Sequence, residues 1–450
     1  MGTQPENPLQ LIAEKTSKDL LKSLADREDK VQDKYDYYNA DNHTRDFGIS
    51  VPKKMIHHRP GIGWAGRAVN TLADRVVFEG FANDKVGMND YFDSIKAATV
   101  INQAKHDAFI AGCAFIAVAD DPLSDKKILV PFTALEATGI VNQTTGLLKV
   151  GLAVTKWAKE TKKINQHAKR QFFAPRDYIL FTPEFTAVFK EKQVDEIYDN
   201  PTGRCLLHPI TRRSTADRPL GKSRITNTVR RIIQEVSRMK RREEIAEEFY
   251  STPQRYITGL AEGAEKDEKL DSALGKVWTI TKDEEGDSPD VGQLRQMDID
   301  QFETAKKDKA RDFCAETSLT LRNLGYETEN PSTPESLKAL SDDLLLEAQN
   351  NQSEIGEQIK QIAITLRLAA DGNDTVPDEL NAIQPAWKPI FQVDVGAAGD
   401  AVYKLFQIMP ELAGTIAGYR MLGVGIREAE DLATKRSKLS TDKFMNQGGQ

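Results

Sequence analysis

The feature that most constrains the fold is a long amphipathic segment between residues 223 and 251. Its apolar side chains recur every three or four positions, the spacing that places them on one side of an α-helix. They are Ile225, Val229, Ile232, Ile233, Val236, Met239, Ile245 and Phe249. Pro253 cannot continue a helix, and Ser223 is a favourable N-cap residue. The pattern predicts a long helix from about Ser223 to Ser251.

The polar side of this helix carries its charge unevenly. Residues 224–242 hold seven Lys or Arg and one Glu, whereas residues 243–248 hold four Glu and no basic residue. The arginines away from the apolar stripe are Arg230, Arg231, Arg238, Arg241 and Arg242. They could contact DNA phosphates or an acidic neighbouring subunit. They could equally form a solvated face with pairs inside the helix, such as Arg231 with Glu235.

Length and composition set broad limits. The 450 residues allow about three domains or one elongated subunit, and 39% hydrophobic with 29% charged residues is enough for sizeable cores. No window approaches the ~20 consecutive apolar residues of a membrane span, and the N-terminus lacks a secretory pattern. The net charge of −7 argues against a surface that grips DNA everywhere. It leaves room for a protein that DNA slides past.

A tempting phosphate-binding motif is incomplete. Gly221-Lys222-Ser223 resembles the end of a Walker A loop, but Ala216 occupies the position of the required first glycine. Nor do the three cysteines and six histidines share the spacing of a metal site. No nucleophile has a base placed beside it. We therefore expect no enzyme activity, no catalytic residue, no metal and no cofactor.

The pattern of elements indicates an α+β protein that is mostly helical. Residues 60–210 contain short β-type runs separated by turns, which predicts an antiparallel sheet. These runs are Lys127–Pro131, Leu147–Val154, Gln171–Phe181 and Ala187–Lys190. Further helices are expected over residues 8–40, 300–317, 334–370 (bending at Gly356), 399–408 and 411–435, with a strand at Trp387–Val393.

Five segments occur in a distinctive order along the chain. They are Tyr37–Asp41, Asn70–Phe81, Pro219–Tyr256, Glu316–Gly325 and Asn330–Ser336. Together they resemble the portal proteins of tailed bacteriophages, of the siphophage type, over residues 8–435. Ala40 departs from the pattern, because members often have Gly there, and this leaves the conformation of that turn open.

The resemblance implies a ring, dodecameric in assembled heads, at one capsid vertex. Its partners would be the terminase large subunit, the major capsid or scaffold protein, a head–tail adaptor and double-stranded DNA that passes without sequence specificity. No membrane would be involved. The expected location is the virion, and the host cytoplasm during assembly. The implied parts are wing 1–224, stem helix 225–251, clip 252–299, second stem helix 300–318, tunnel loop 319–333, long kinked tunnel helix 334–370, wing return strand 371–395, crown helices 396–435 and disordered tail 436–450.

The implied tunnel loop has few charges that could hold DNA. Arg322 is its only basic residue, and Glu327 and Glu329 balance it. Asn323 and Thr328 add uncharged polar groups. We expect Arg322, Asn323 and Thr328 to lie near DNA. Two other classes remain open from the sequence: another oligomeric phage component of the capsid or baseplate, and a soluble enzyme with an unrecognised site.

Overall fold

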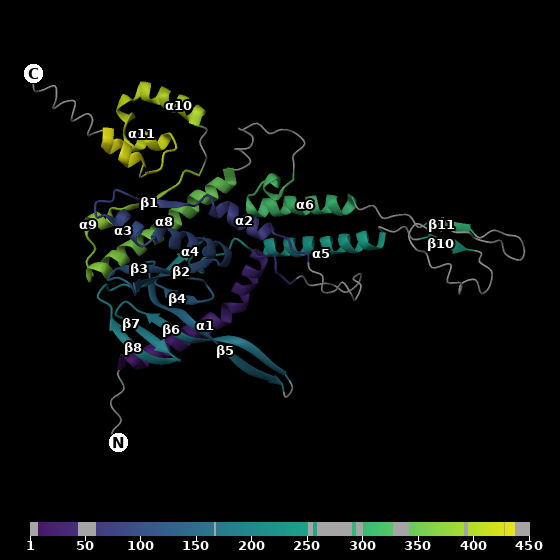
Figure 1. Cartoon of the computed structure of the whole chain (residues 1–450), viewed down its shortest axis with the longest axis horizontal. Coiled ribbons are helices and arrows are strands. Elements are labelled where there is room, and N and C mark those ends of the chain that lie inside the picture. The colour runs from purple at the N-terminus through teal and green to yellow at the C-terminus, as the bar shows by residue number, and fades with distance from the viewer. Residues whose placement is uncertain are drawn as a thin grey trace, which may run out of the picture.

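The computed structural model shows a body of helices and strands from which one pair of helices projects (Figure 1). It describes residues 8–43, 60–165, 168–250, 255–258, 290–293, 300–326, 342–390, 395–426 and 428–436. Thr328, most of the expected clip, the start of the expected tunnel helix and residues 437–450 lie outside the described residues. None of the described helices is both long and apolar enough to cross a membrane.

A three-stranded antiparallel sheet forms the centre of the body. Its order is β3-β2-β9, with β2 (Cys113–Asp120) in the middle, β3 (Lys127–Phe132) on one side and β9 (Leu207–Thr211) on the other. Six successive residues of β2 and all five of β9 are buried. Such continuous burial requires cover on both faces. Helix α4 (Ala97–Ala111) and helix α8 (Asp342–Asp371) pack against these strands and share one apolar cluster with Ile116. Phe115 of β2 belongs to a second cluster, which includes residues of the neighbouring sheet.

A second, five-stranded antiparallel sheet follows the chain order. The strands are β4 (Ala137–Val141), β5 (Leu148–Asn165), β6 (Ala168–Phe181), β7 (Phe185–Lys190) and β8 (Gln193–Asp199). The first helix, α1 (Pro8–Tyr38), packs against this sheet through Ala13, Leu20 and Leu24. The predicted antiparallel sheet of an α+β protein is confirmed.

Ala40, the residue at which the sequence departs from the portal pattern, lies in the turn after α1. Ala40 has a φ of 60°, in the left-handed region that costs a residue with a Cβ free energy and favours glycine. The chain therefore adopts at Ala40 the conformation that a glycine would adopt at least cost.

Helices α2 (Trp64–Ala73), α3 (Met88–Ser94) and α9 (Asp378–Asn381) complete the body, together with a short antiparallel pair of strands. This pair joins β1 (Phe78–Ala82) to β12 (Gln384–Trp387). The strand expected at Trp387–Val393 was wrong in position over the residues that the structure describes: β12 ends at Trp387, residues 388–390 are not in a strand, and residues 391–394 lie outside the described residues. The backbone of α8 stays helical through Gly356, the residue at which a bend was expected. An added Cβ there would lie 3.5 Å from the Trp387 indole nitrogen, so Gly356 packs closely against β12.

The projecting arm consists of α5 (Asn227–Tyr250) and α6 (Asp300–Thr317), which lie side by side and run in opposite directions (Figure 1). A two-stranded antiparallel pair, β10 (Arg255–Thr258) and β11 (Asp290–Gln293), lies beyond the far end. The predicted long helix is confirmed. Its predicted cap is wrong: the helix begins after Thr226, whose Oγ1 accepts from Val229 N at 3.2 Å.

The C-terminal elements form a separate group beside the body (Figure 1). They are α10 (Val395–Ile408), a 3-10 turn at Pro410–Leu412, α11 (Ile416–Met421) and a helical segment over 428–436. The single helix expected over 411–435 is wrong. Gly414 and Gly423 have φ values of 89° and 82°, a left-handed conformation that ends a helix.

Candidate functional site

The root of the projecting arm is held by the glycine and serine that open the recognisable segment 219–225. Gly221 has a φ of 74°, and a Cβ there would lie 2.6 Å from Gly112 O. Ser223 is buried; its Oγ donates to Ile110 O at 2.5 Å and accepts from Ile225 N at 2.9 Å. Lys222 N donates to Arg212 O at 2.7 Å. These hydrogen bonds and this close approach hold the chain against α4 and the end of β9. Gly221, Lys222 and Ser223 therefore have a structural role and do not form a phosphate-binding loop.

A buried ion cluster lies directly behind this root. The carboxylate of Glu347, on α8, pairs with the guanidinium groups of Arg212 and Arg224, and the three side chains are at most 6% exposed. Arg213, largely exposed, approaches the same carboxylate at 3.6 Å. Arg224 also donates to Thr317 O, at the end of α6, at 2.7 Å. One carboxylate therefore connects α8, the end of β9, the start of α5 and the end of α6.

The charges in this cluster stabilise one another. Burial alone would raise the pKa of Glu347, but Arg224 and Arg212 hold that pKa below its ordinary value. Burial lowers the pKa of Arg212 to about 10 against the opposing effect of Glu347, so Arg212 stays cationic at neutral pH. Removing one member would leave charge buried without a partner, which costs about 3–5 kcal/mol in comparable pairs. The cluster is a rigid joint between body and arm.

One side of α8 also forms hydrogen bonds with β9 and with the loop that follows it. Gln358 accepts from Thr211 N at 2.9 Å and donates to Thr211 Oγ1 at 2.7 Å. Glu354 accepts from Arg213 N and Ser214 N, both at 2.8 Å. The chain between β9 and α5 is thus bound to α8 over three helical turns.

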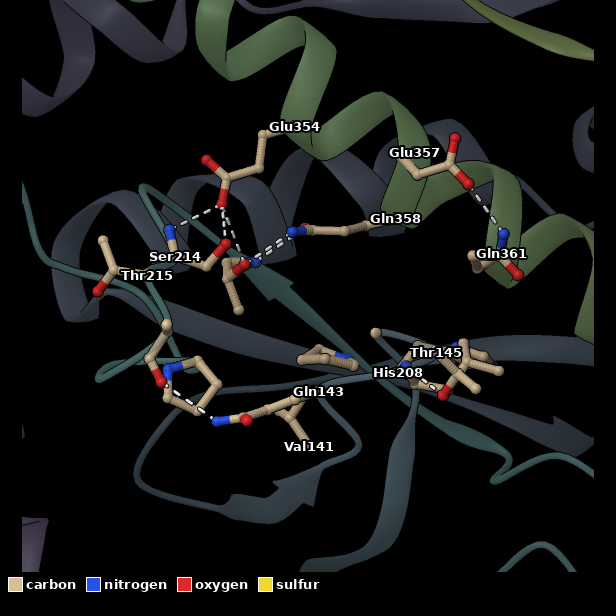
Figure 2. Close-up of a pocket in the computed structure, with 16 residues that line it drawn as sticks. Val141, Gln143, Thr145, His208, Ser214, Thr215, Glu354, Glu357, Gln358 and Gln361 are labelled. Atoms are coloured by element: carbon tan, nitrogen blue, oxygen red, sulfur yellow. Dashed lines mark hydrogen bonds between the residues drawn. The ribbon is translucent and has the colours of Figure 1, made fainter.

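A cavity of about 670 Å³ lies below this contact. Figure 2 shows Glu354, Glu357, Gln358 and Gln361 of α8 along one side and Gln143, Thr145 and His208 on the other. His208 is buried, and burial together with Arg204 lowers its pKa to about 3, so the ring is neutral at pH 7. Among the described residues, no three His, Cys, Asp or Glu side chains gather where they could hold a metal ion. The cavity brings together amides, hydroxyls and carboxylates that are largely bonded to each other.

The expected tunnel-loop residues begin at a fixed turn beside the joint. Leu321–Leu324 forms one 3-10 turn, and Asn323 Oδ1 accepts from Thr320 N at 3.0 Å and from Thr320 Oγ1 at 2.7 Å. Arg67 of α2 donates to Asn323 O at 2.9 Å. Arg322 is exposed on this turn. The structure therefore presents Arg322 to solvent, whereas the side-chain oxygen of Asn323 serves the turn itself; contact with DNA stays a prediction for both.

The arginines of α5 do not form one uniform face. Arg231 and Arg242 are exposed, and Arg230 and Arg238 are half-buried. Arg241 is 3% exposed, so its expected place away from the apolar stripe is wrong. Its long aliphatic stem allows burial one turn before Ile245.

The ion pairs of this helix also differ from those expected. Arg230 pairs with Asp33 of α1. Glu235, expected to pair with Arg231, instead binds Lys309 of α6 at 3.0 Å. α5 is thus fastened by charge to both α1 and α6 of the same chain. Contact of its arginines with DNA or with a neighbouring subunit stays a prediction.

Sequence reasoning missed the ion cluster. The sequence pattern assigns no role to Arg212, places Arg224 only in the basic half of the predicted long helix, and places Glu347 only within the helix expected over 334–370. No local pattern marks them, because their partners lie 135 and 123 positions away along the chain. A charged residue on the otherwise apolar side of α8, among Leu344, Leu345 and Ala348, is the one signal that could have identified Glu347.

Comparison with known proteins extends the motif-based resemblance. No protein-family profile matches the sequence. The portal protein of Mycobacterium phage D29 is 21% identical over 443 residues, covering 92% of this chain and 86% of that protein. The portal protein of Mycobacterium phage L5 is 22% identical over 429 residues, covering 88% and 82%. The resemblance predicted from the order of the segments is confirmed over nearly the whole chain.

Among solved structures, a chain of one described as "Neck of empty GTA particle computed with C6 symmetry" aligns with 83% of this chain and 93% of its own. The TM-score is 0.44 and the identity 11%. The likeness is too distant to establish a shared fold.

Proposed function

We propose that this chain is a portal subunit of a tailed phage, a structural protein whose copies form a ring around a DNA channel. The observation that carries the proposal is its similarity to two phage portal proteins over 92% and 88% of its length. The match extends across more than four-fifths of both relatives, so it spans most of the chain and not one shared module. The proposed location is the virion, at one capsid vertex.

The described elements support a division of this subunit into portal parts. The body with its two larger sheets is the wing, α5 and α6 are the stem, and β10 and β11 begin and end the clip. The turn at Leu321–Leu324 opens the tunnel loop, α8 is the helix behind it, and α10 and α11 belong to the crown. An antiparallel pair of helices that leaves the body and carries a small module at its far end fits an element that lines a channel (Figure 1).

The charges support a channel that passes DNA without holding it. Duplex DNA carries one charge per ~1.7 Å of axis, so a strongly basic bore repeated around a ring would bind tightly. On α5, Arg230 and Arg241 are withdrawn by pairing or burial, and Lys309 of α6 is neutralised by Glu235. Arg322, exposed on a fixed turn, is the proposed point of weak contact with DNA phosphates.

The buried joint supports a mechanical role. DNA driven through a ring exerts force on whatever lines it, and a projecting helix pair must transfer that force to the body. Glu347 binds Arg224 at the start of α5, and Arg224 in turn binds the end of α6. Both stem helices are therefore anchored to α8 through one buried cluster.

The proposed partners are the terminase large subunit at the clip during packaging, a head–tail adaptor afterwards, and coat or scaffold protein around the wing. A binding experiment separates a portal from another capsid or baseplate component. The tagged full-length chain is tested for retention of the terminase large subunit encoded by the same phage. One variant has residues 260–289 replaced by a short Gly-Ser linker, which keeps both strands of the β10–β11 pair.

We expect terminase binding by the full chain and its loss in the linker variant. A variant that lacks residues 437–450 serves as the control and should bind as the full chain does. Absence of terminase binding by the full chain would contradict the portal proposal. Binding retained by the linker variant would contradict the clip assignment alone.

A further inference from the structure

The two longest strands among the described residues, β5 and β6, extend far beyond the sheet that contains them. β4 pairs with β5 only as far as Ala153, and β7 pairs with β6 only from Tyr178 onward. The backbone of β5 and β6 nevertheless continues to pair out to Asn165 and Ala168. Residues 156–165 and 168–175, here called the ribbon, therefore form a two-stranded projection from the body (Figure 1).

The ribbon reverses the charge of the rest of the chain. Residues 156–170 contain one acidic residue, Glu160, and six basic residues: Lys156, Lys159, Lys162, Lys163, Lys169 and Arg170. This stretch has a net charge of +5, while the remaining sequence, with 55 basic and 67 acidic residues, has a net charge of −12. Lys156 and Lys159, at the described base of the ribbon, are exposed.

The register of the ribbon places like charges opposite one another. Lys162 pairs in register with Arg170, and Lys163 with Lys169. Like charges directly across an antiparallel pair are destabilising, and a two-stranded ribbon is marginal in water even without them. The register therefore sets two pairs of basic residues opposite one another, one pair on each face of the ribbon, and neutral residues at these positions would destabilise it less. A polyanion bound to one face would offset the repulsion on that face.

We propose that the ribbon binds the phosphate backbone of double-stranded DNA, at a site separate from the α5–α6 arm and from the turn that carries Arg322. Residues on one face of a strand are about 6.6 Å apart, close to two steps of about 3.4 Å between phosphates along one DNA strand, so basic residues at alternate positions can each meet a phosphate. A two-stranded ribbon also fits the major groove. Five of the six cations are lysines, which bind phosphate as point charges, whereas the bidentate pairing typical of protein carboxylates favours arginine. The contact is independent of sequence and does not require a ring.

The test measures binding of a short fluorescein-labelled duplex of mixed sequence to the full chain by anisotropy, over a series of salt concentrations. The variant carries Lys162→Gln, Lys163→Gln, Lys169→Gln and Arg170→Gln. The control carries Lys85→Gln, Lys96→Gln, Lys126→Gln and Lys404→Gln, four exposed lysines elsewhere with the same total change in charge. Labelled poly-glutamate serves as a second probe, and sedimentation and electron microscopy report assembly for all three proteins.

We expect the ribbon variant to bind DNA at least about tenfold more weakly than the wild type at low salt, with a salt slope smaller by up to about 3.6, since each of the four phosphate contacts contributes ~0.9. The control should bind as the wild type does. The ribbon variant should also unfold no more readily than the wild type, because the cross-strand repulsion is gone.

Equal DNA binding by the ribbon variant and the wild type would overturn the proposal. So would tighter binding of poly-glutamate than of DNA, or a change in assembly alone, since either would make the partner an acidic protein surface. Loss of ring assembly in every sample, with DNA binding still dependent on the ribbon, would contradict the portal proposal and leave this one standing.

Discussion

Glu347 and Arg224 form an ion pair inside the protein, with side chains that are only 6% and 3% exposed. The pair joins α8 to the segment that begins α5. Replacing Glu347 with Gln leaves the guanidinium groups of Arg212 and Arg224 buried without an anion. We expect a loss of about 3–5 kcal/mol in the free energy of unfolding, measured by urea denaturation followed by circular dichroism.

The exposed Glu357, on the same helix, provides the matched control. Its carboxylate accepts one bond from Gln361, and Glu357→Gln should change the free energy of unfolding by under about 0.5 kcal/mol. If Glu347→Gln were as mild as Glu357→Gln, the cluster would not be a structural joint.

We expect the protein to lose stability in mild acid because the His208 ring is buried in its neutral form. Burial lowers its pKa in the folded protein to about 3, below the ordinary value of 6.5. As pH falls below 6.5 the unfolded chain takes up a proton that the folded chain does not, so its contribution to stability is complete above pH 6.5 and declines below it. The expected decline is about 2 kcal/mol between pH 6.5 and pH 5.

The measurement is the urea midpoint at several pH values for the wild type and for His208→Gln. We expect the variant to lose less stability than the wild type over this range. His43→Gln, at an exposed position, should follow the wild type. Parallel pH profiles for wild type and His208→Gln would show that this ring is protonated equally in both states.

We expect one added methyl group at Gly221 to lower the stability of the protein strongly. Gly221 and Gly146 both have a left-handed φ, 74° and 72°, but a Cβ at Gly146 meets nothing within 4 Å, whereas at Gly221 it meets backbone atoms of Gly112 and Arg212 at 2.6–2.9 Å. Gly146→Ala should cost about 1 kcal/mol, the conformational term alone. Gly221→Ala should cost several times more, as measured by thermal unfolding. Equal losses would mean that the root of α5 moves freely.

Arg322 predicts a functional effect with no effect on folding. Its side chain is exposed on a turn that Thr320 and Asn323 fix, so Arg322→Ala should leave the unfolding temperature unchanged. If Arg322 contacts DNA in the channel, the variant should package or eject DNA at a rate altered at least about twofold, since one exposed charge contributes up to about 1 kcal/mol. Arg218→Ala, also exposed, is the control. Unchanged packaging and ejection would make the contact incidental.

Local pattern predicted much of the fold. The apolar periodicity of 225–249 identified α5, and alternating β-type runs identified β3, β5, β6 and β7, because each pattern repeats within one element. The start of α5 was misplaced by three residues, since Ser223 and Thr226 are both good caps and only the contact of Ser223 with Ile110 decides between them.

What the sequence could not reveal depends on partners far apart in the chain. The burial of Arg241 and the pairing of Glu347 with Arg212 and Arg224 arise where β9, α5, α6 and α8 meet, and no spacing along the chain encodes that meeting. The breaks at Gly414 and Gly423 were overlooked for another reason. A glycine inside a helical pattern is tolerated often enough that its presence alone does not end a helix.

Electron microscopy of the purified full-length protein shows whether the chain assembles into a portal ring. We expect rings with a central hole, lined by α5 and α6, with the wing sheets at the outer edge. The same experiment is made after co-expression with the coat and scaffold proteins of the phage, in case the ring forms only with them. A protein that stays monomeric at every concentration, alone and after co-expression, or a ring whose hole is lined by other elements, would contradict the account.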